Sequence, residues 1–161
     1  MGLDQYAQLR NRKVDWKKFY SDNEEESQAE QKGVFVWRKH ARLQVFMNEQ
    51  WRKQNSHKVK EQQRKAEKDI KSKKSTFMDF DLSHLGFNAG EKVYMTEEVC
   101  DNLEKAISSN YAEYFASDGF FWGQQFQEHS VKEYEEQDLA FLNFCRQAIK
   151  DKKVVEYECS W

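Results

Sequence analysis

Two polar residues interrupt apolar faces that helical periodicity would bury. His40 lies in the segment 34–51, where apolar residues recur at steps of three or four and predict one buried helix face. The apolar members of that face are Val36, Leu43, Met47 and Trp51. Asp138 occupies the same kind of position in the segment 131–150. A buried charge is unfavourable unless it is paired, so we expect His40 and Asp138 to meet, directly or through a bound polar ligand.

A His–Asp pair has two interpretations, and the sequence leaves both open. The carboxylate can orient the imidazole as a general base, or the two groups can form a satisfied structural pair. The working hypothesis has Asp138 in a structural role and His40 on the wall of a pocket.

The stretch GFFWG (119–123) places three aromatic residues between two glycines. In a strand, Phe120 and Trp122 would point to one face of the sheet and Phe121 to the other. Helices on one side of a sheet can bury only one of these sets. The other face would be covered by the 11–33 segment or by a dimer partner, or its aromatic side chains would form a pocket or a contact surface.

No complete catalytic or metal-binding motif is present. The chain has no GxGxxG, GxxxxGK[ST] or HExxH pattern, which disfavours the familiar nucleotide enzymes. Cys159 and Ser160 lack the elbow or helix start that activates a nucleophile. Asp79, Asp81 and His84, and His129 among its acidic neighbours, match no known ligand spacing. We therefore predict no catalytic residue, no metal and no cofactor, and we favour a protein that is not an enzyme.

The segment 52–74 is strongly basic. It holds ten Lys or Arg against three acids, a local net charge of +7, and it could be a helix that extends the preceding one or a mobile arm. It is either a solvated charged arm or a docking surface for nucleic acid or an acidic partner. It contains no aromatic residue to stack on bases, which weakens the hypothesis that it binds single-stranded nucleic acid. The candidate contact residues are Lys58, Lys60, Arg64, Lys65, Lys68 and Lys71.

Composition sets the class of protein. The chain has 161 residues, a net charge of −2 and a mean hydropathy of −1.04, yet 12 Phe, 7 Tyr and 5 Trp can build a compact core. The three cysteines show no CxxC spacing and fit free thiols in a reducing compartment. No apolar run is long enough for a signal peptide or a membrane span. We expect a cytoplasmic protein with no membrane contact and one domain over 1–161, within which 52–76 is a basic arm or insertion.

The pattern of elements predicts an α+β fold. Strands are expected near 3–10, 91–95, 119–123 and 153–161, and helices over 34–54, 96–109 and 130–151. The segment 11–33 is predicted to be a charged loop. These elements form a small, mostly antiparallel sheet covered on one face by about three helices.

Five short motifs, in order along the chain, resemble a family of small uncharacterised bacteriophage proteins that is frequent in phages of marine cyanobacteria. They are MGLDQY, WRKHARLQ, the FN pair at 87–88, GFFWG and the final SW. The resemblance covers most of the chain except 11–33 and 53–80. Trp122 departs from the third Phe that is more usual in the family. The matching positions are Trp37, Arg38, Lys39, His40, Asn88, Gly119, Phe120, Phe121, Gly123 and Trp161.

This resemblance implies a viral protein acting in a bacterial cytoplasm, without implying a mechanism. The leading hypothesis is a non-catalytic accessory protein that binds a host protein during infection and redirects or inhibits it through the aromatic and His/Asp surface. The first alternative is a binder of, or an enzyme acting on, a nucleotide or other small phosphorylated ligand, with Trp37 or Trp122 stacking on a base and Arg38 and Lys39 neutralising phosphate. The second is nucleic-acid binding through 52–74. The predicted ligand or partner site comprises Trp37, Arg38, Lys39, His40, Asn88, Phe120, Phe121, Trp122, Asp138 and Trp161.

Overall fold

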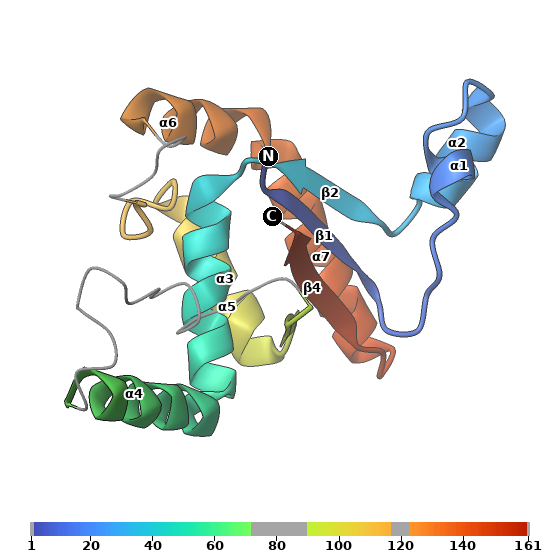
Figure 1. The fold of residues 1–161 in the computed structure, drawn as a ribbon. Helices are drawn as coiled ribbons and strands as arrows, with labels where there is room; N and C mark the ends of the chain where they lie inside the picture. Colours follow the sequence, from blue (N-terminus) through green and yellow to red (C-terminus); the bar gives the residue numbers. More distant parts are fainter. Residues whose placement is uncertain (1, 72–89, 117–122, 161) are drawn as a thin grey trace.

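A computed structural model describes residues 2–71, 90–116 and 123–160, although not the side chains of 66, 69 and 70. Over these ranges the chain has an α+β fold with a small antiparallel sheet of strand order β2-β1-β4-β3 (Figure 1). The strands are β1 (Asp4–Leu9), β2 (Phe35–Arg38), β3 (Lys92–Tyr94) and β4 (Val155–Ser160). The helices are α1 (Trp16–Phe19), α2 (Glu24–Gln31), α3 (Ala41–Gln54), α4 (Ser56–Lys71), α5 (Glu97–Ser108), α6 (Gln124–Glu133) and α7 (Glu135–Lys150).

The two faces of the sheet differ because side chains alternate along each strand. In β4, Val155, Tyr157 and Cys159 are buried, as the alternation in the sequence predicts. They belong to one core with residues of α3, α5 and α7, and Phe141 of α7 packs its ring 5.0 Å from that of Trp37. Figure 1 shows α7 behind β1 and β4. The prediction of an α+β fold with helices on one face of the sheet is confirmed.

The prediction of one helix from 34 is wrong. Residues 35–38 form β2, which pairs antiparallel with β1, and α3 begins only at Ala41. The chain turns at Lys39, whose φ is +59°, and His40 is the N-cap of α3. Aromatic and β-branched residues favour a strand when a partner strand is available, and that partner is distant in sequence.

Three other element predictions need correction. Residues 11–33 are not only loop, because α1 and α2 lie there with side-chain caps from Asp15 and Asn23. The predicted helix 130–151 is two helices, α6 and α7, that meet at Tyr134. The basic segment is a separate helix, α4, because Asn55 ends α3 with φ −121°.

The predicted strand at 119–123 is replaced at its last residue by a helix start. Gly123 is the N-cap of α6, and 119–122 lie outside the described residues. Among the described elements, the fourth strand of the sheet is β2, which lies at the edge beside β1.

Glutamine side chains cover both edges of the sheet. At the β3 edge, the amide of Gln54 accepts from the Tyr94 N–H (3.1 Å) and donates to the Tyr94 carbonyl (2.7 Å). At the β2 edge, Gln137 donates to the Val36 carbonyl (2.7 Å), and the Arg38 N–H donates to the Tyr134 hydroxyl (3.0 Å). A side-chain amide thus takes the place of a neighbouring strand, so these edges offer few free groups for strand addition.

Candidate functional site

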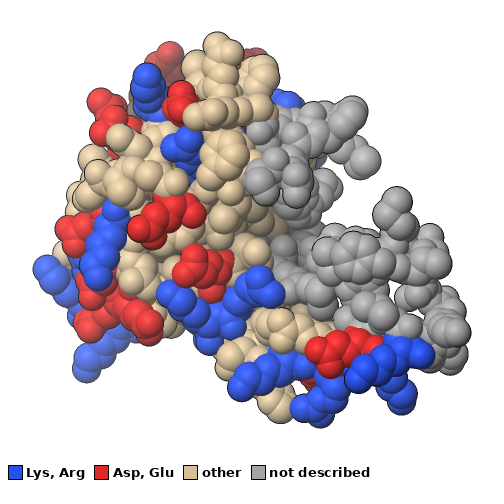
Figure 2. Space-filling model, turned by 90° about the vertical axis from the view of Figure 1, so that its left-hand side faces the viewer, with Lys and Arg blue, Asp and Glu red and all other residues tan. Residues whose placement is uncertain are grey.

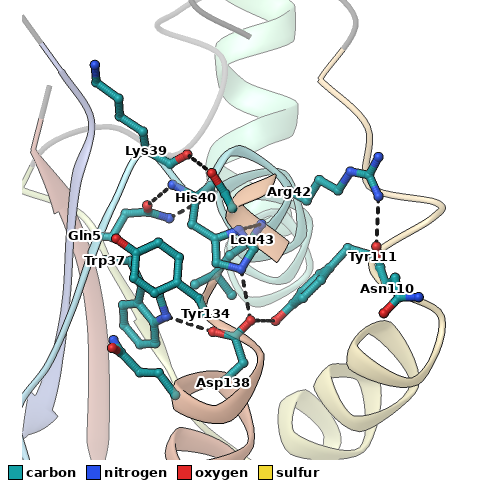
Figure 3. A network of polar contacts seen from close by, with 12 residues as sticks. Gln5, Trp37, Lys39, His40, Arg42, Leu43, Asn110, Tyr111, Tyr134 and Asp138 are labelled. Carbon is teal, nitrogen blue, oxygen red and sulfur yellow. Dashed lines mark hydrogen bonds and ion pairs between the residues drawn. The ribbon is translucent and has the colours of Figure 1, made fainter. Parts of the chain in front are cut away.

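The carboxylate of Asp138 lies at the centre of a buried polar cluster. Its Oδ1 accepts from the indole N–H of Trp37 (2.7 Å), and its Oδ2 accepts from the Tyr111 hydroxyl (2.9 Å) and contacts His40 Nε2 (2.9 Å) (Figure 3). Only 2 % of Asp138 is exposed. Asp138 stands in the first turn of α7, where the helix dipole also favours a negative charge. The predicted contact between His40 and Asp138 is therefore confirmed.

His40 is held on every side. Its Nδ1 accepts the Leu43 N–H (3.4 Å) as the cap of α3, so the ring proton lies on Nε2 and is donated to Asp138. The ring of Tyr134 stacks on the imidazole with 5.6 Å between centroids, and the ring of Tyr111 meets it edge-on at 5.2 Å. His40 exposes none of its surface.

This geometry corrects the hypothesis that His40 lines a pocket. A general base needs a nitrogen lone pair that faces the substrate. Both ring nitrogens of His40 are occupied by protein groups, and the side chain is fully buried. The cluster therefore fixes the start of α3 against α7, which is a structural role.

Tyr111 is a member of the cluster that the sequence did not indicate. It follows α5 with φ +52°, and its N–H donates to the Ala106 carbonyl (2.7 Å). Burial, and then the charge of Asp138, raise the pKa of Tyr111 well above its usual value, so the hydroxyl remains a donor. A tyrosine directly after a helix end is too common a pattern to predict such a contact.

A second buried chain of hydrogen bonds joins the sheet to α3. Gln5 pairs its amide with the N–H and carbonyl of His40 (2.9 and 3.1 Å) and also donates to the Tyr157 hydroxyl (2.7 Å). Tyr157 donates to Gln44 (2.7 Å), which donates to Cys159 Sγ (3.3 Å). Burial raises the pKa of Tyr157 well above its usual value and that of Cys159 to about 11. All three cysteines are free and buried.

The remaining residues of the predicted site do not join this cluster. Arg38 and Lys39 are exposed, and the nearest charged partner of Arg38 is Asp4 at 3.9 Å. Trp37, His40 and Asp138 lie inside the protein, so these five residues do not form one ligand site. The other predicted members, Asn88, Phe120, Phe121, Trp122 and Trp161, lie outside the described residues.

The basic residues predicted for contact are all exposed on α4. Lys65 pairs with Glu61 (3.3 Å) and Lys58 with Glu91 (3.8 Å). Lys60, Arg64, Lys68 and Lys71 have no acidic partner among the described residues, and their spacing of four, four and three places them on one side of the helix. We call these four residues the basic stripe. Figure 2 shows the Lys and Arg side chains of α4 gathered along the lower edge of the molecule.

No group of three or more His, Cys, Asp or Glu side chains is placed to hold a metal ion in the described part of the chain. None of the described helices combines the length and apolar composition needed to cross a bilayer. Comparison with protein-family models, with curated proteins and with solved structures found no match.

Proposed function

We propose that this chain is a non-catalytic phage accessory protein that binds an acidic surface of a host protein through α4. The observation that carries the proposal is the separation of charge between the segment 52–74, which contains α4, and the rest of the chain. Residues 52–74 carry +7, so the remainder of a chain with a net charge of −2 carries −9. Such separation orients a protein as it approaches a charged partner.

The basic stripe is suited to contact. Its four cations are exposed, and none of them forms an ion pair with an acidic side chain of the described residues. From Lys60 to Lys71 the stripe is about 16 Å long at the helical rise per residue. A standard protein–protein interface buries about 800 Å² per partner. A stripe of this length fits within such an area, so one acidic patch on a partner protein can cover it.

A protein partner fits the charge distribution better than a nucleic acid does. A nucleic acid is an extended polyanion, and the remaining −9 of the chain would be repelled along its length. A protein surface of limited size can meet the stripe and avoid the rest of the chain.

The polar atoms of the buried cluster are used within the protein, which favours a structural role for the cluster over a catalytic one. Trp37, His40 and Asp138 use their polar atoms on each other and on Tyr111 and Leu43, and they are buried. They stabilise the scaffold that presents α4.

The test is affinity capture from a cyanobacterial host lysate with quantitative mass spectrometry. One variant reverses the stripe with K60E, R64E, K68E and K71E. The matched control reverses four exposed lysines elsewhere with K17E, K18E, K105E and K132E, so both variants change the net charge equally. We expect a host protein that the wild type and the control capture and that the stripe variant loses. Purified partner should then bind with a strong salt dependence.

Two results would contradict the proposal. Capture that nuclease treatment abolishes would assign α4 to nucleic acid. Capture that both variants retain, or that both lose, would show that the stripe is not the contact surface.

A further inference from the structure

Two neighbouring hollows lie at the end of the sheet where β1 leaves it. The first, of about 620 Å³, lies between β3, the start of α5 and the turn from α7 to β4. The second, of about 490 Å³, lies beside the ends of β1 and β3 over Glu156. Arg10 and Tyr94 line both hollows. We call the two together the sheet-end groove, and it uses no residue of α4.

The two hollows have different chemistry. The first is lined by Tyr94, Met95, Ile149 and Val154, with Lys152 and Lys153 among its polar neighbours. Its apolar side chains suit a flat hydrophobic group. Arg10, Arg12, Lys13 and Lys92 line the second and favour an anion. Each hollow has the size of a small-molecule site.

The shared wall is organised by a carboxylate beneath it. Glu156 is 8 % exposed and pairs with Arg10 Nε (3.3 Å) and Lys92 Nζ (2.8 Å). The guanidinium of Arg10 also lies over the ring of Tyr94, 5.7 Å from its centroid. One acid thus positions two cations and leaves their other N–H groups for a ligand. The bond to Glu156 raises the pKa of Lys92, which keeps its ammonium charged.

The local charge is positive in a chain whose net charge is negative. Six cations line the two hollows against Glu97 and Glu156. Arg12 is partly occupied, because it donates to the Glu30 carbonyl (2.6 Å) and to the Lys32 carbonyl. Lys13 is exposed and has no acidic partner among the described residues.

One polar atom in the second hollow lacks a hydrogen bond. Gln8 Oε1 is buried and unpartnered, while its Nε2 donates to the Arg12 carbonyl (3.2 Å). A buried acceptor without a donor is unfavourable, and because this oxygen is covered, the Gln8 amide would have to shift before a ligand hydroxyl could reach it.

From these features we propose that the sheet-end groove binds a nucleotide-type ligand. The base lies in the first hollow against Tyr94, which is 39 % exposed. The phosphates lie in the second hollow near Arg10, Lys13 and Lys92. Stacking and charge neutralisation are the two contributions that bind nucleotides without a dedicated phosphate loop.

The test is calorimetric titration of the full chain with ADP, adenosine and pyrophosphate at about 0.15 M salt, where the Debye length is about 8 Å and the charge of distant α4 is largely screened. ADP should bind saturably, one per chain, and at least about tenfold more tightly than adenosine or pyrophosphate, because only ADP fills both hollows. Tyr94→Leu should weaken ADP binding about tenfold and pyrophosphate binding much less, because Arg10 loses its contact with the ring but keeps its pair with Glu156. Lys13→Met should weaken ADP and pyrophosphate and leave adenosine unchanged.

Two controls separate this proposal from the function of α4. Lys132→Met, at an exposed site on α6, and the stripe variant should both bind ADP like the wild type. Absence of saturable ADP binding at millimolar concentration would overturn the proposal. Equal binding of pyrophosphate and ADP would also overturn it and leave an anion site only. Neither result would affect capture of a host protein by α4.

Discussion

Replacing Asp138 by asparagine tests whether the buried cluster stabilises the fold. Asp138 accepts three hydrogen bonds, from Trp37, His40 and Tyr111, and only 2 % of the residue is exposed. An asparagine amide has one oxygen and one NH2 group. In either orientation its NH2 group faces an N–H donor, of Trp37 in one case and of His40 in the other.

The cluster has little freedom to adapt to this change. His40 cannot move its proton to Nδ1, because that atom accepts the Leu43 N–H. The Tyr111 hydroxyl can rotate and accept a hydrogen bond from the new NH2 group. The N–H of Trp37 or of His40 cannot, so at least one of these two hydrogen bonds is lost, together with the negative charge that strengthened the others. A hydrogen bond to a charged group contributes about 1.5–3 kcal/mol. We therefore expect Asp138→Asn to lower the free energy of unfolding by about 2–4 kcal/mol.

The assay is urea unfolding followed by circular dichroism, with calorimetry for Tm. For a chain of this length, the expected loss corresponds to a fall in Tm of roughly 5–15 °C. The matched control is Asp22→Asn, because Asp22 is exposed and should change stability by less than about 0.5 kcal/mol. A loss as small as the control's would refute the argument, since it would mean that water solvates the Asp138 carboxylate.

Three further outcomes are expected. Changing His40 to alanine removes the cap of α3 as well as a donor to Asp138. It should therefore lower the free energy of unfolding by about 3 kcal/mol or more in the same assay. A loss below about 1 kcal/mol would restore the interpretation that His40 lines a pocket. Stability should fall as pH rises above about 8.5, because the unfolded chain ionises the Cys159 thiol there, and Tyr111 and Tyr157 near pH 10, before the folded chain does. In the folded chain the pKa of Cys159 is about 11 and those of the two tyrosines are raised, so urea midpoints constant from about pH 7 to 10.5 would contradict this. Gln54→Ala should speed hydrogen exchange of the Tyr94 amide, measured by NMR, and lower the free energy of unfolding by about 1 kcal/mol, whereas Gln63→Ala, at an exposed site on α4, should change neither.

The sequence predicted most accurately the elements whose signals are local. The strand expected near 153–161 is β4, and the helix expected from 96 is α5, whose cap Thr96 accepts the Val99 N–H (3.3 Å). Likewise, Asp138 was recognisable because an acid on an apolar helix face needs a partner. In each case the pattern and its cause lie within a few residues.

The local signal failed where a distant strand decided the conformation. Residues 34–40 fit helical spacing, yet β1 supplies hydrogen bonds that turn 35–38 into β2 and leave His40 as a cap. The prediction that His40 meets Asp138 was correct although the helix that motivated it begins after His40. Spacing can identify a buried position without identifying the element that carries it.

By itself, then, the sequence determined the α+β class, the buried partners His40 and Asp138 and the charge of α4, because hydrophobic periodicity and charge act over short stretches. Tertiary structure alone decided that Trp37 and Tyr111 complete the cluster and that both His40 nitrogens are occupied. It also brought Arg10, Tyr94 and Lys92 over Glu156. These contacts join residues up to 146 positions apart, between Arg10 and Glu156, and no local pattern specifies such pairs. They follow from the register of the sheet and from how the helices pack on it.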